Sequence, residues 1–282
     1  MKLASYVLEG RASFGAIEDG KVFDLGRRIG ARFPDLRALV AGEAYEEAKR
    51  AIRGASPDAS IEHIAFLPVI PNPGKIFCVG LNYEEHVQET KRDKSENPSI
   101  FVRWPESQVG HRQPMLMPRE STQFDYEGEI AVVIGRGGRR IRKEDALSHV
   151  AGYSCYHDGS VRDWQRHTTQ WTPGKNFVAT GGFGPWMVTR DEIPDGTKLE
   201  LTTRLNGQVM QHADTSMMIF TIPVVIQYIS TFTPLAPGDV IATGTPGGVG
   251  SRRNPPVWMK PGDSVEVEVS RVGTLVNPIA RD

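Results

Sequence analysis

Two glutamates, Glu127 and Glu129, lie two positions apart in the run FDYEGEIAVVIG, residues 124–135. Apolar side chains occupy alternate positions of this run, which predicts one β-strand. A strand sends every second side chain to the same face, so the two carboxylates point the same way, roughly 7 Å apart. Mg²⁺, Mn²⁺ and Ca²⁺ prefer such oxygen ligands, and a metal site is one interpretation. The other is a pair of exposed carboxylates on a solvated strand face.

A histidine and a glutamate, His86 and Glu89, lie three residues apart in a predicted helix that Asn82 is suited to cap. Residues at this spacing occupy neighbouring turns of one helix face. A carboxylate beside an imidazole raises its basicity and fixes its tautomer, as a general base requires. The alternative is an exposed pair on a solvated helix. The charged segment that follows, residues 91–98, is either a mobile lid or an ordinary surface loop.

A polar cluster follows the strand that we predict at residues 150–155. Asp158 lies just past the strand end, where site residues are common. Arg162 and Gln165 continue the cluster. The guanidinium of Arg162 has the fork geometry to clamp a substrate carboxylate, and the alternative is a pair with Asp158 or with its neighbour in sequence, Asp163.

Two turn-like segments complete the candidate site. Lys175 follows Pro173-Gly174, a position that by itself is typical of an exposed lysine. Residues 243–250, TGTPGGVG, form a glycine-rich loop whose amides and hydroxyls are able to hold a carboxylate or an enolate. A tight turn explains these glycines equally well.

The composition excludes several classes of protein. The 282 residues carry 33 basic and 34 acidic side chains without a basic block, which argues against nucleic acid as a partner. No apolar run is long enough for a membrane span, and Glu9 and Arg11 interrupt any signal-peptide core. Two cysteines make neither a disulfide framework nor a zinc site. We therefore expect a soluble protein of a reducing compartment, the cytoplasm.

The predicted elements describe a β-rich α+β chain in two parts. Residues 1–70 form a small N-terminal α/β module of short strands and a helical stretch at 25–53, and a Pro-rich linker at 68–75 leads into a domain at 71–282. In that domain Asn206-Gly207 predicts a hairpin turn. Residues 217–232 predict an apolar core helix in which Met217 and Met218 fill space.

Several spaced motifs resemble the fumarylacetoacetate hydrolase family. In order they are DYEGEIAVVIG, HDGSVRDWQ, PGKNF followed by FGPW, LNGQVMQ and PGDVIATGTPGGVG. The resemblance covers about residues 70–280. It implies a mixed β-sandwich roll, a homodimer, bound Mg²⁺ or Mn²⁺ and a keto or diketo acid as substrate.

The resemblance also implies roles for individual residues. The metal ligands correspond to Glu127, Glu129 and Asp158, and a His-x-x-Glu dyad corresponds to His86 and Glu89. Positions that contact the bound keto acid or its oxyanion in the family correspond to Arg162, Gln165, Lys175 and Thr245.

Three functions follow as hypotheses. The first is a metal-dependent hydrolase that cleaves a C–C bond in an acylpyruvate or related diketo acid, with water activated by His86 and Glu89. The second is a 2-keto acid decarboxylase of the oxaloacetate type, an isomerase (tautomerase) or a dehydratase that uses the same metal. The third is a non-catalytic β-rich binding protein with a solvated Glu-x-Glu. Family members perform several of these reactions, so the resemblance does not choose among them.

The chain departs from the family pattern at two places. Many members read NDVSARD where this chain has HDGSVRD, residues 157–163, and many read KSFD where it has KNFV, residues 175–178. Both changes lie beside predicted site residues. They bear on the substrate more than on the fold or the metal.

Overall fold

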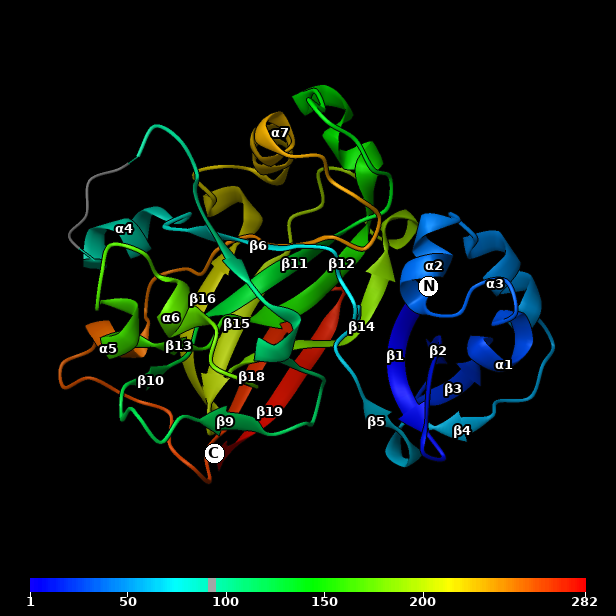
Figure 1. The fold of residues 1–282 in the computed structure, drawn as a ribbon, viewed down its shortest axis with the longest axis horizontal. Coiled ribbons are helices and arrows are strands. Elements are labelled where there is room, and N and C mark those ends of the chain that lie inside the picture. Colours follow the sequence, from blue (N-terminus) through cyan, green and yellow to red (C-terminus); the bar gives the residue numbers. More distant parts are fainter. Residues whose placement is uncertain (91–94) are drawn as a thin grey trace.

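Two packed β-sheets with short helices at their margins make up the fold (Figure 1). The computed structural model describes residues 1–90 and 95–282. This mixed, sheet-rich α+β architecture confirms the predicted fold class. The segment interpreted as a lid or a surface loop, residues 91–98, lies in part outside the described residues.

The larger sheet has 12 strands and carries the candidate site. Its main path, in spatial order, is β4 (Ala59–Ser60), β3 (Lys21–Asp24), β2 (Arg11–Glu18), β1 (Lys2–Leu8), β14 (Gly181–Thr189), β12 (Val150–His157), β11 (Gly128–Ile134), β17 (Val240–Ala242), β6 (Ile76–Gly80) and β7 (Ser99–Arg103). Two short strands join from the side, β5 (Ala65–Phe66) on β1 and β8 (Gln108–Val109) on β14.

A five-stranded sheet packs against the centre of the larger one. Its strands, in order, are β16 (Gln208–Asp214), β15 (Glu200–Leu205), β18 (Ser264–Val269), β19 (Gly273–Arg281) and β9 (Met115–Met117). Their inward side chains share one core with β11 and β12, for example Val267 with Ile130 and Val132. A separate pair, β10 (Phe124–Asp125) and β13 (Ser160–Val161), lies at the end of this sandwich. Alternating apolar residues on facing strands build such a core.

The helices are short and peripheral. The α-helices are α1 (Leu25–Ile29), α2 (Leu36–Ala41), α3 (Tyr45–Ile52), α4 (Glu84–Thr90), α5 (Arg162–Gln165), α6 (Thr172–Lys175) and α7 (Ile222–Phe232). The 3₁₀ segments are η1 (Ile61–His63), η2 (Pro105–Ser107), η3 (Lys143–His149), η4 (Arg190–Glu192), η5 (Thr215–Met217) and η6 (Gly250–Arg252). Among the described residues, no helix has the length and apolar character needed to cross a membrane.

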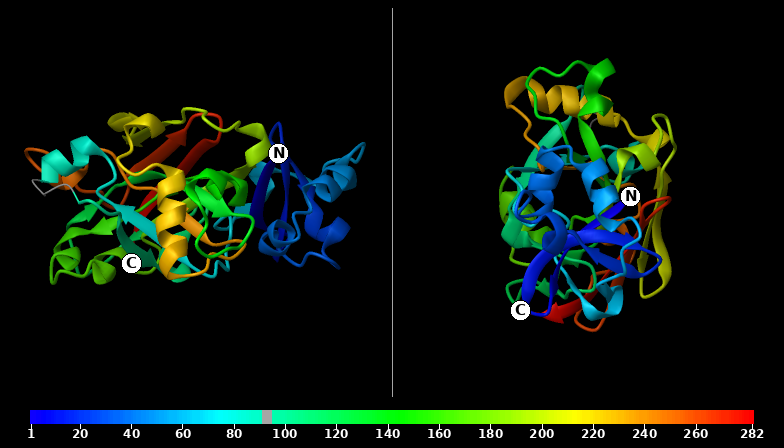
Figure 2. Two further views of the ribbon diagram at one scale, coloured as in Figure 1. Left: turned by 90° about the horizontal axis from the view of Figure 1, so that it is seen from above. Right: turned by 90° about the vertical axis from the view of Figure 1, so that its right-hand side faces the viewer.

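The N-terminal module continues the larger sheet. β1 pairs antiparallel with β14, with Lys2 opposite Val188 and Leu3 opposite Met187. The helices α1 to α3 cover these strands at one end of the molecule (Figures 1 and 2). A core shared by Leu3, Leu36 and Tyr156 connects the module to the strands of the site. The boundary at residue 70 stays a prediction.

Residues 124–135 do not form the single strand that the alternation predicts. The strand is divided at Tyr126 and Glu127, because β10 pairs with β13 whereas β11 pairs with β12 and β17. The carboxylate of Asp125 accepts the main-chain N–H of Tyr126 at 2.9 Å, which occupies a donor that a ladder would use. The alternation itself persists along β11, where Ile130 and Val132 enter one core and Ala131 enters the other.

Other predicted elements have mixed outcomes. The Asn206-Gly207 hairpin is confirmed, with φ of 52° and 79° at its two central residues. The predicted helix at 217–232 begins only at Ile222. Of the two methionines predicted to fill the core, Met218 is buried in it, whereas Met217 is 40% exposed. Asn82 does not cap α4, because its buried amide bonds the main chain of Phe220 and Thr243 instead.

Candidate metal centre and active site

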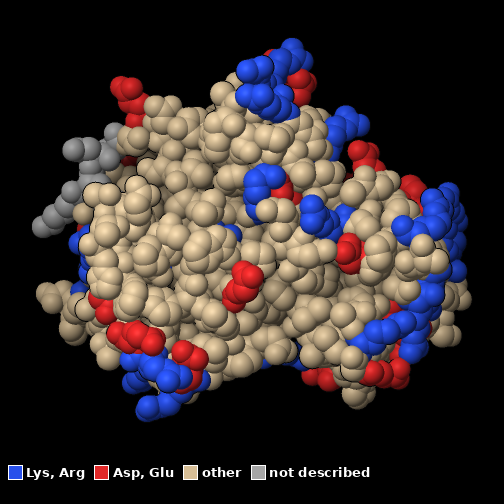
Figure 3. Space-filling model, viewed as in Figure 1, with Lys and Arg blue, Asp and Glu red and all other residues tan. Residues whose placement is uncertain are grey.

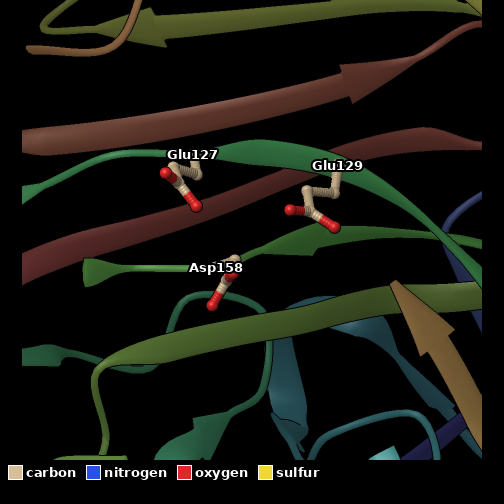
Figure 4. A group of neighbouring side chains, drawn as sticks. All are labelled: Glu127, Glu129 and Asp158. Atoms are coloured by element: carbon tan, nitrogen blue, oxygen red, sulfur yellow. The ribbon is translucent and has the colours of Figure 1, made fainter. Parts of the chain in front are cut away.

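Three carboxylates meet where two neighbouring strands end. Glu127 directly precedes β11, Glu129 lies within it, and Asp158 directly follows β12. The antiparallel register sets Gly128 opposite His157, and the N–H of Asp158 donates to the carbonyl of Glu127 at 2.8 Å. One oxygen from each side chain lies within 4.8 Å of the others, and all three residues are buried. Figure 4 shows the three side chains lying next to one another. We call this set the carboxylate triad.

The electrostatics of the triad favour a bound cation. Burial raises the pKa of Glu129 well above its usual value, and the negative charges of Asp158 and Glu127 raise it further. Burial also opposes the charged form of Glu127, but the positive charges of Arg162 and Lys175 outweigh burial and lower the pKa of Glu127. Three buried carboxylates with oxygen-only donors fit a hard divalent cation such as Mg²⁺, Mn²⁺ or Ca²⁺.

Lys175 is buried beside the triad, unlike a typical lysine after a turn. Its Nζ donates to Oε2 of Glu127 at 2.6 Å and to Oδ2 of Asp158 at 2.7 Å. The turn brings it there because α6 packs directly on α5. A Cβ at Gly174 would lie 2.3 Å from the main-chain nitrogen of Gln165, so only glycine allows this approach.

Arg162 pairs with neither of the two aspartates considered as its alternative partners. Its Nε donates to Oδ2 of Asp125 at 2.7 Å, its Nη2 to Oε1 of Glu127 at 2.5 Å and its Nη1 to Oε1 of Gln165 at 2.9 Å. All three nitrogens of the guanidinium therefore bond protein acceptors. The side chain is buried and held in one orientation over the triad.

The sequence reasoning missed Asp125, which is fully buried. Besides Arg162, it binds the η6 turn, because its carboxylate accepts the N–H of Gly250 at 2.8 Å and of Ser251 at 3.0 Å. The sequence did contain a signal for this role, because Asp125, Glu127 and Glu129 occupy alternate positions of one run and so point to the same face of a strand.

Arg103, at the end of β7, was also missed. Its Nη1 donates to Oδ1 of Asp158 at 2.5 Å and its Nη2 to Oγ1 of Thr180 at 2.9 Å, with the guanidinium fully buried. No local sequence pattern indicates that this arginine belongs to the site. Only the pairing of β7 into the sheet brings it to the triad.

The predicted dyad forms on α4. Nδ1 of His86 lies 2.7 Å from Oε1 of Glu89. When the imidazole is neutral and donates this bond, its lone pair is on Nε2, which has no hydrogen bond to any described residue. His86 is 6% exposed, and it lines the same cavity as the triad. An imidazole that a carboxylate holds in one tautomer in this way has the geometry that a general base requires.

The glycine-rich loop at 243–250, interpreted from the sequence either as a cradle for a carboxylate or enolate or as a tight turn, holds the protein's own carboxylates. The N–H of Gly244 donates to Oε2 of Glu129 at 2.8 Å, and that of Gly248 to Oε2 of Glu89 at 2.9 Å. Gly248 has a φ of +95°, and a Cβ there would lie 2.3 Å from a main-chain oxygen. The loop thus requires glycine in order to hold the site in place.

One cavity of about 680 Å³ brings the predicted residues together. It is lined by the carboxylate triad and by His86, Arg162, Gln165, Lys175 and Thr245, whereas Glu89 is not among the lining residues. The hydroxyl of Thr245 accepts a bond from Nε2 of Gln211 at 2.8 Å, which leaves its proton available to the cavity. The individual roles of these residues stay predictions.

Comparisons with known proteins agree with this geometry. A model of the fumarylacetoacetate (FAA) hydrolase C-terminal family matches residues 75–280. The chain is 40% identical over 243 residues to the mitochondrial oxaloacetate tautomerase Fahd2a of Rattus norvegicus, covering 86% of this chain and 78% of the relative.

Solved structures agree as well. The fumarylacetoacetate hydrolase from psychrophilic Exiguobacterium antarcticum is 32% identical, with a TM-score of 0.83 and full coverage of both chains. The maleylpyruvate hydrolase from Sphingobium sp. SYK-6, in complex with manganese(II) and pyruvate, is 26% identical with a TM-score of 0.83, covering 100% of this chain and 99% of that one. The sequence motifs, the fold and these matches together show that this chain belongs to the fumarylacetoacetate hydrolase family.

Proposed function

We propose that this chain is an enzyme acting on 2-keto acids, with Mg²⁺ or Mn²⁺ held by Glu127, Glu129 and Asp158. The observation that carries the proposal is that His86 and the carboxylate triad line the same cavity. A divalent cation held there would act as a Lewis acid, polarising the keto acid and stabilising negative charge. The manganese and pyruvate bound to the maleylpyruvate hydrolase support this choice of ligands.

His86 is the proposed general base. Its Nδ1 contact with Glu89 at 2.7 Å keeps the ring in one tautomer, and its Nε2 is free to take a proton from water or from a substrate carbon. The carboxylate of Glu89 stabilises the imidazolium that results. General acid–base catalysis of this kind contributes roughly 10²–10⁴-fold to a rate.

Lys175 and Thr245 are the proposed stabilisers of developing negative charge. Lys175 uses two of its three N–H donors on Glu127 and Asp158, and Thr245 is oriented by its bond from Gln211. Donors that are fixed before the reaction need no reorganisation during it.

Arg162 and Gln165 are the proposed contacts for the keto acid's carboxylate. They bond each other at 2.9 Å and both line the cavity. Because the guanidinium already bonds three protein acceptors, we expect it to contribute mainly its charge and its fixed orientation.

Two reactions use this machinery. The first is hydrolysis of a C–C bond in an acylpyruvate or related diketo acid, in which His86 deprotonates a water molecule that attacks the distal carbonyl. The second is keto–enol tautomerisation of an oxaloacetate-type acid, in which His86 removes a proton from the carbon next to the keto group or returns it there. The 40% identity to an oxaloacetate tautomerase is the specific observation that favours the second. A decarboxylase or a dehydratase would use the same triad.

The deciding experiment measures turnover in the ultraviolet with Mg²⁺- or Mn²⁺-loaded protein. The substrates are acetylpyruvate, fumarylpyruvate and oxaloacetate, the last followed both for enol–keto conversion and for loss of CO₂. Hydrolysis predicts pyruvate from the acylpyruvates, whereas tautomerisation predicts only a faster enol–keto exchange. In His86→Ala we expect either reaction to slow by at least roughly 100-fold.

A matched variant separates the dyad from the helix that carries it. Gln88→Ala changes an exposed residue of α4 between the dyad's members, and its kinetics should equal those of the wild type. If His86→Ala keeps the full rate on the substrate that the enzyme turns over, the dyad is not the base. If no 2-keto acid reacts or binds, the proposed function is wrong.

Two further predictions stay open, the homodimer that the resemblance implies and the cytoplasmic location that the composition suggests. In support of a dimer, β7 is the last strand of the described sheet, and it exposes Val102 at 38% of its surface, with Trp104 just beyond at 52%. Light scattering on the purified protein tests the dimer. On location, the rat relative is described as mitochondrial.

A further inference from the structure

Three buried cations surround the carboxylate triad, and all are committed to the protein's own carboxylates; Arg162 and Lys175 line the cavity and Arg103 lies behind it. Arg103 pairs with Asp158, Arg162 with Asp125 and Glu127, and Lys175 with Glu127 and Asp158. These three cations face four buried carboxylates, the triad and Asp125, so one negative charge is left over. A divalent cation and one substrate carboxylate would balance this centre. A second substrate carboxylate would need a cation elsewhere.

Arg252 supplies such a cation at the rim. It is the last residue of η6, it lines the cavity, and it is exposed. Its guanidinium makes no ion pair or hydrogen bond with any residue that the structure describes, whereas its main-chain N–H donates to the carbonyl of Val249 at 3.2 Å. Its backbone is nevertheless fixed, because the two preceding amides, of Gly250 and Ser251, donate to the buried carboxylate of Asp125. The guanidinium of Arg252 is therefore an unpaired positive charge that a fixed turn places at the cavity.

The cavity between the two positions suits an extended substrate. Its volume of about 680 Å³ exceeds what a three-carbon keto acid fills. Apolar side chains form part of its wall, among them Phe101, Trp171 and Val249. The rings of Phe101 and Trp171 contact each other edge to face, with centroids 5.4 Å apart. This wall fits an apolar or unsaturated carbon chain, with a polar group at each end.

We propose that Arg252 binds a second, remote carboxylate of the substrate and thereby selects dicarboxylic 2-keto acids over monocarboxylic ones. This inference rests on the proposed function, since it assumes that the keto acid end lies at the carboxylate triad. It adds a specificity-determining residue and a chemical class, namely a keto acid whose second carboxylate lies several carbons from the first. A guanidinium–carboxylate contact at such a rim is the interaction that confers this selectivity.

The test compares two ligands of equal length, 2-oxoadipate and 2-oxohexanoate, which differ only in the remote carboxylate. Isothermal titration of the Mn²⁺-loaded protein measures the dissociation constant of each, so the test is independent of the reaction catalysed. For the wild type we expect 2-oxoadipate to bind about tenfold more tightly. In Arg252→Gln the ratio of the two constants should fall to about one, and Arg252→Lys should keep part of the preference.

Each remaining outcome decides between alternatives. Arg166→Gln removes the charge of another exposed arginine that lines the cavity. If that variant, and not Arg252→Gln, removes the preference, the assignment to Arg252 is wrong. Equal loss of affinity for both ligands in Arg252→Gln indicates a structural role and also overturns it. If neither ligand binds the wild-type protein with Mn²⁺ present, the proposed function itself fails and this inference fails with it.

Discussion

The main-chain N–H of Gly248 donates to Oε2 of Glu89 at 2.9 Å, while Oε1 of the same carboxylate contacts Nδ1 of His86 at 2.7 Å. The glycine-rich loop and helix α4 therefore hold Glu89 from two sides. A second amide of the loop, that of Gly244, holds Glu129 of the carboxylate triad. One loop thus fixes a member of the dyad and a member of the triad.

Gly248→Ala tests whether the loop positions the dyad. The new Cβ would lie 2.3 Å from the carbonyl oxygen of Met210, and φ of +95° is unfavourable for alanine, so the loop must shift away from Glu89. We expect kcat to fall by roughly 10- to 100-fold, by analogy with lost general-base positioning, with metal affinity retained. Steady-state kinetics and metal titration measure the two quantities.

Gly207→Ala is the matched control for that variant. Gly207 also has a positive φ, of 79°, but no atom lies within 4 Å of its potential Cβ, and it is in the hairpin between β15 and β16. It should lower stability and leave kcat unchanged. Equal activity loss in both variants would show that general destabilisation, not the position of Glu89, is responsible.

Metal binding should stabilise the fold. A ligand that binds only the folded state at about 100 times its dissociation constant adds roughly 2.7 kcal/mol. We expect Mn²⁺ or Mg²⁺ to raise the Tm and EDTA to reverse the rise. Glu129→Gln removes one oxygen ligand and should remove the rise, whereas Glu120→Gln, at an exposed position, should keep it. An identical Tm for the wild type with Mn²⁺ and with EDTA would contradict the metal site.

Asp125→Asn should destabilise the protein. The substitution removes a buried negative charge that contacts Nε of Arg162 and three main-chain amides, so the guanidinium loses one of its two carboxylate partners. Loss of one partner from such a buried pair costs about 3–5 kcal/mol. Urea unfolding measures the change. Asp263→Asn is the control, since that buried carboxylate bonds Lys260 N–H and Asn206 without an arginine, and its effect should be smaller.

Stability should fall in mild acid because of His111. Burial, and to a smaller extent the charge of Arg112, lowers the pKa of His111 from the ordinary value of 6.5 to about 4. Between these two pH values the unfolded chain binds a proton that the folded chain does not. Stability is therefore complete above pH 6.5 and declines toward pH 4, by about 3 kcal/mol for a shift of this size.

His111→Asn tests this origin of the acid sensitivity. The N–H of Val276 donates to Nδ1 of His111 at 3.1 Å, and the asparagine oxygen offers a replacement acceptor. The decline in the free energy of unfolding between pH 6.5 and 4, from urea titrations, should shrink in this variant. The exposed residue His212, replaced in the same way, should leave the decline unchanged. A wild-type slope in His111→Asn would assign the acid sensitivity to other groups.

The sequence by itself determined the local features of the site. Alternation put Glu127 and Glu129 on one face, i,i+3 spacing joined His86 to Glu89, and Asn-Gly set the hairpin. These are consequences of backbone periodicity over a few residues, so a linear pattern is sufficient to predict them. The spaced motifs added the family and, through it, Asp158.

Tertiary structure alone decided which groups neutralise the negative charge of the buried carboxylates. Arg103 reaches Asp158 from 55 positions away, and Arg162 pairs with Asp125 although closer aspartates were available in the sequence. Lys175 is buried because α6 packs on α5, and the loop amides bind the protein's carboxylates because β17 lies beside β11. Each of these contacts depends on strand order and register, which local spacing does not encode. The buried charges impose their partners only once the sheet has excluded water from them.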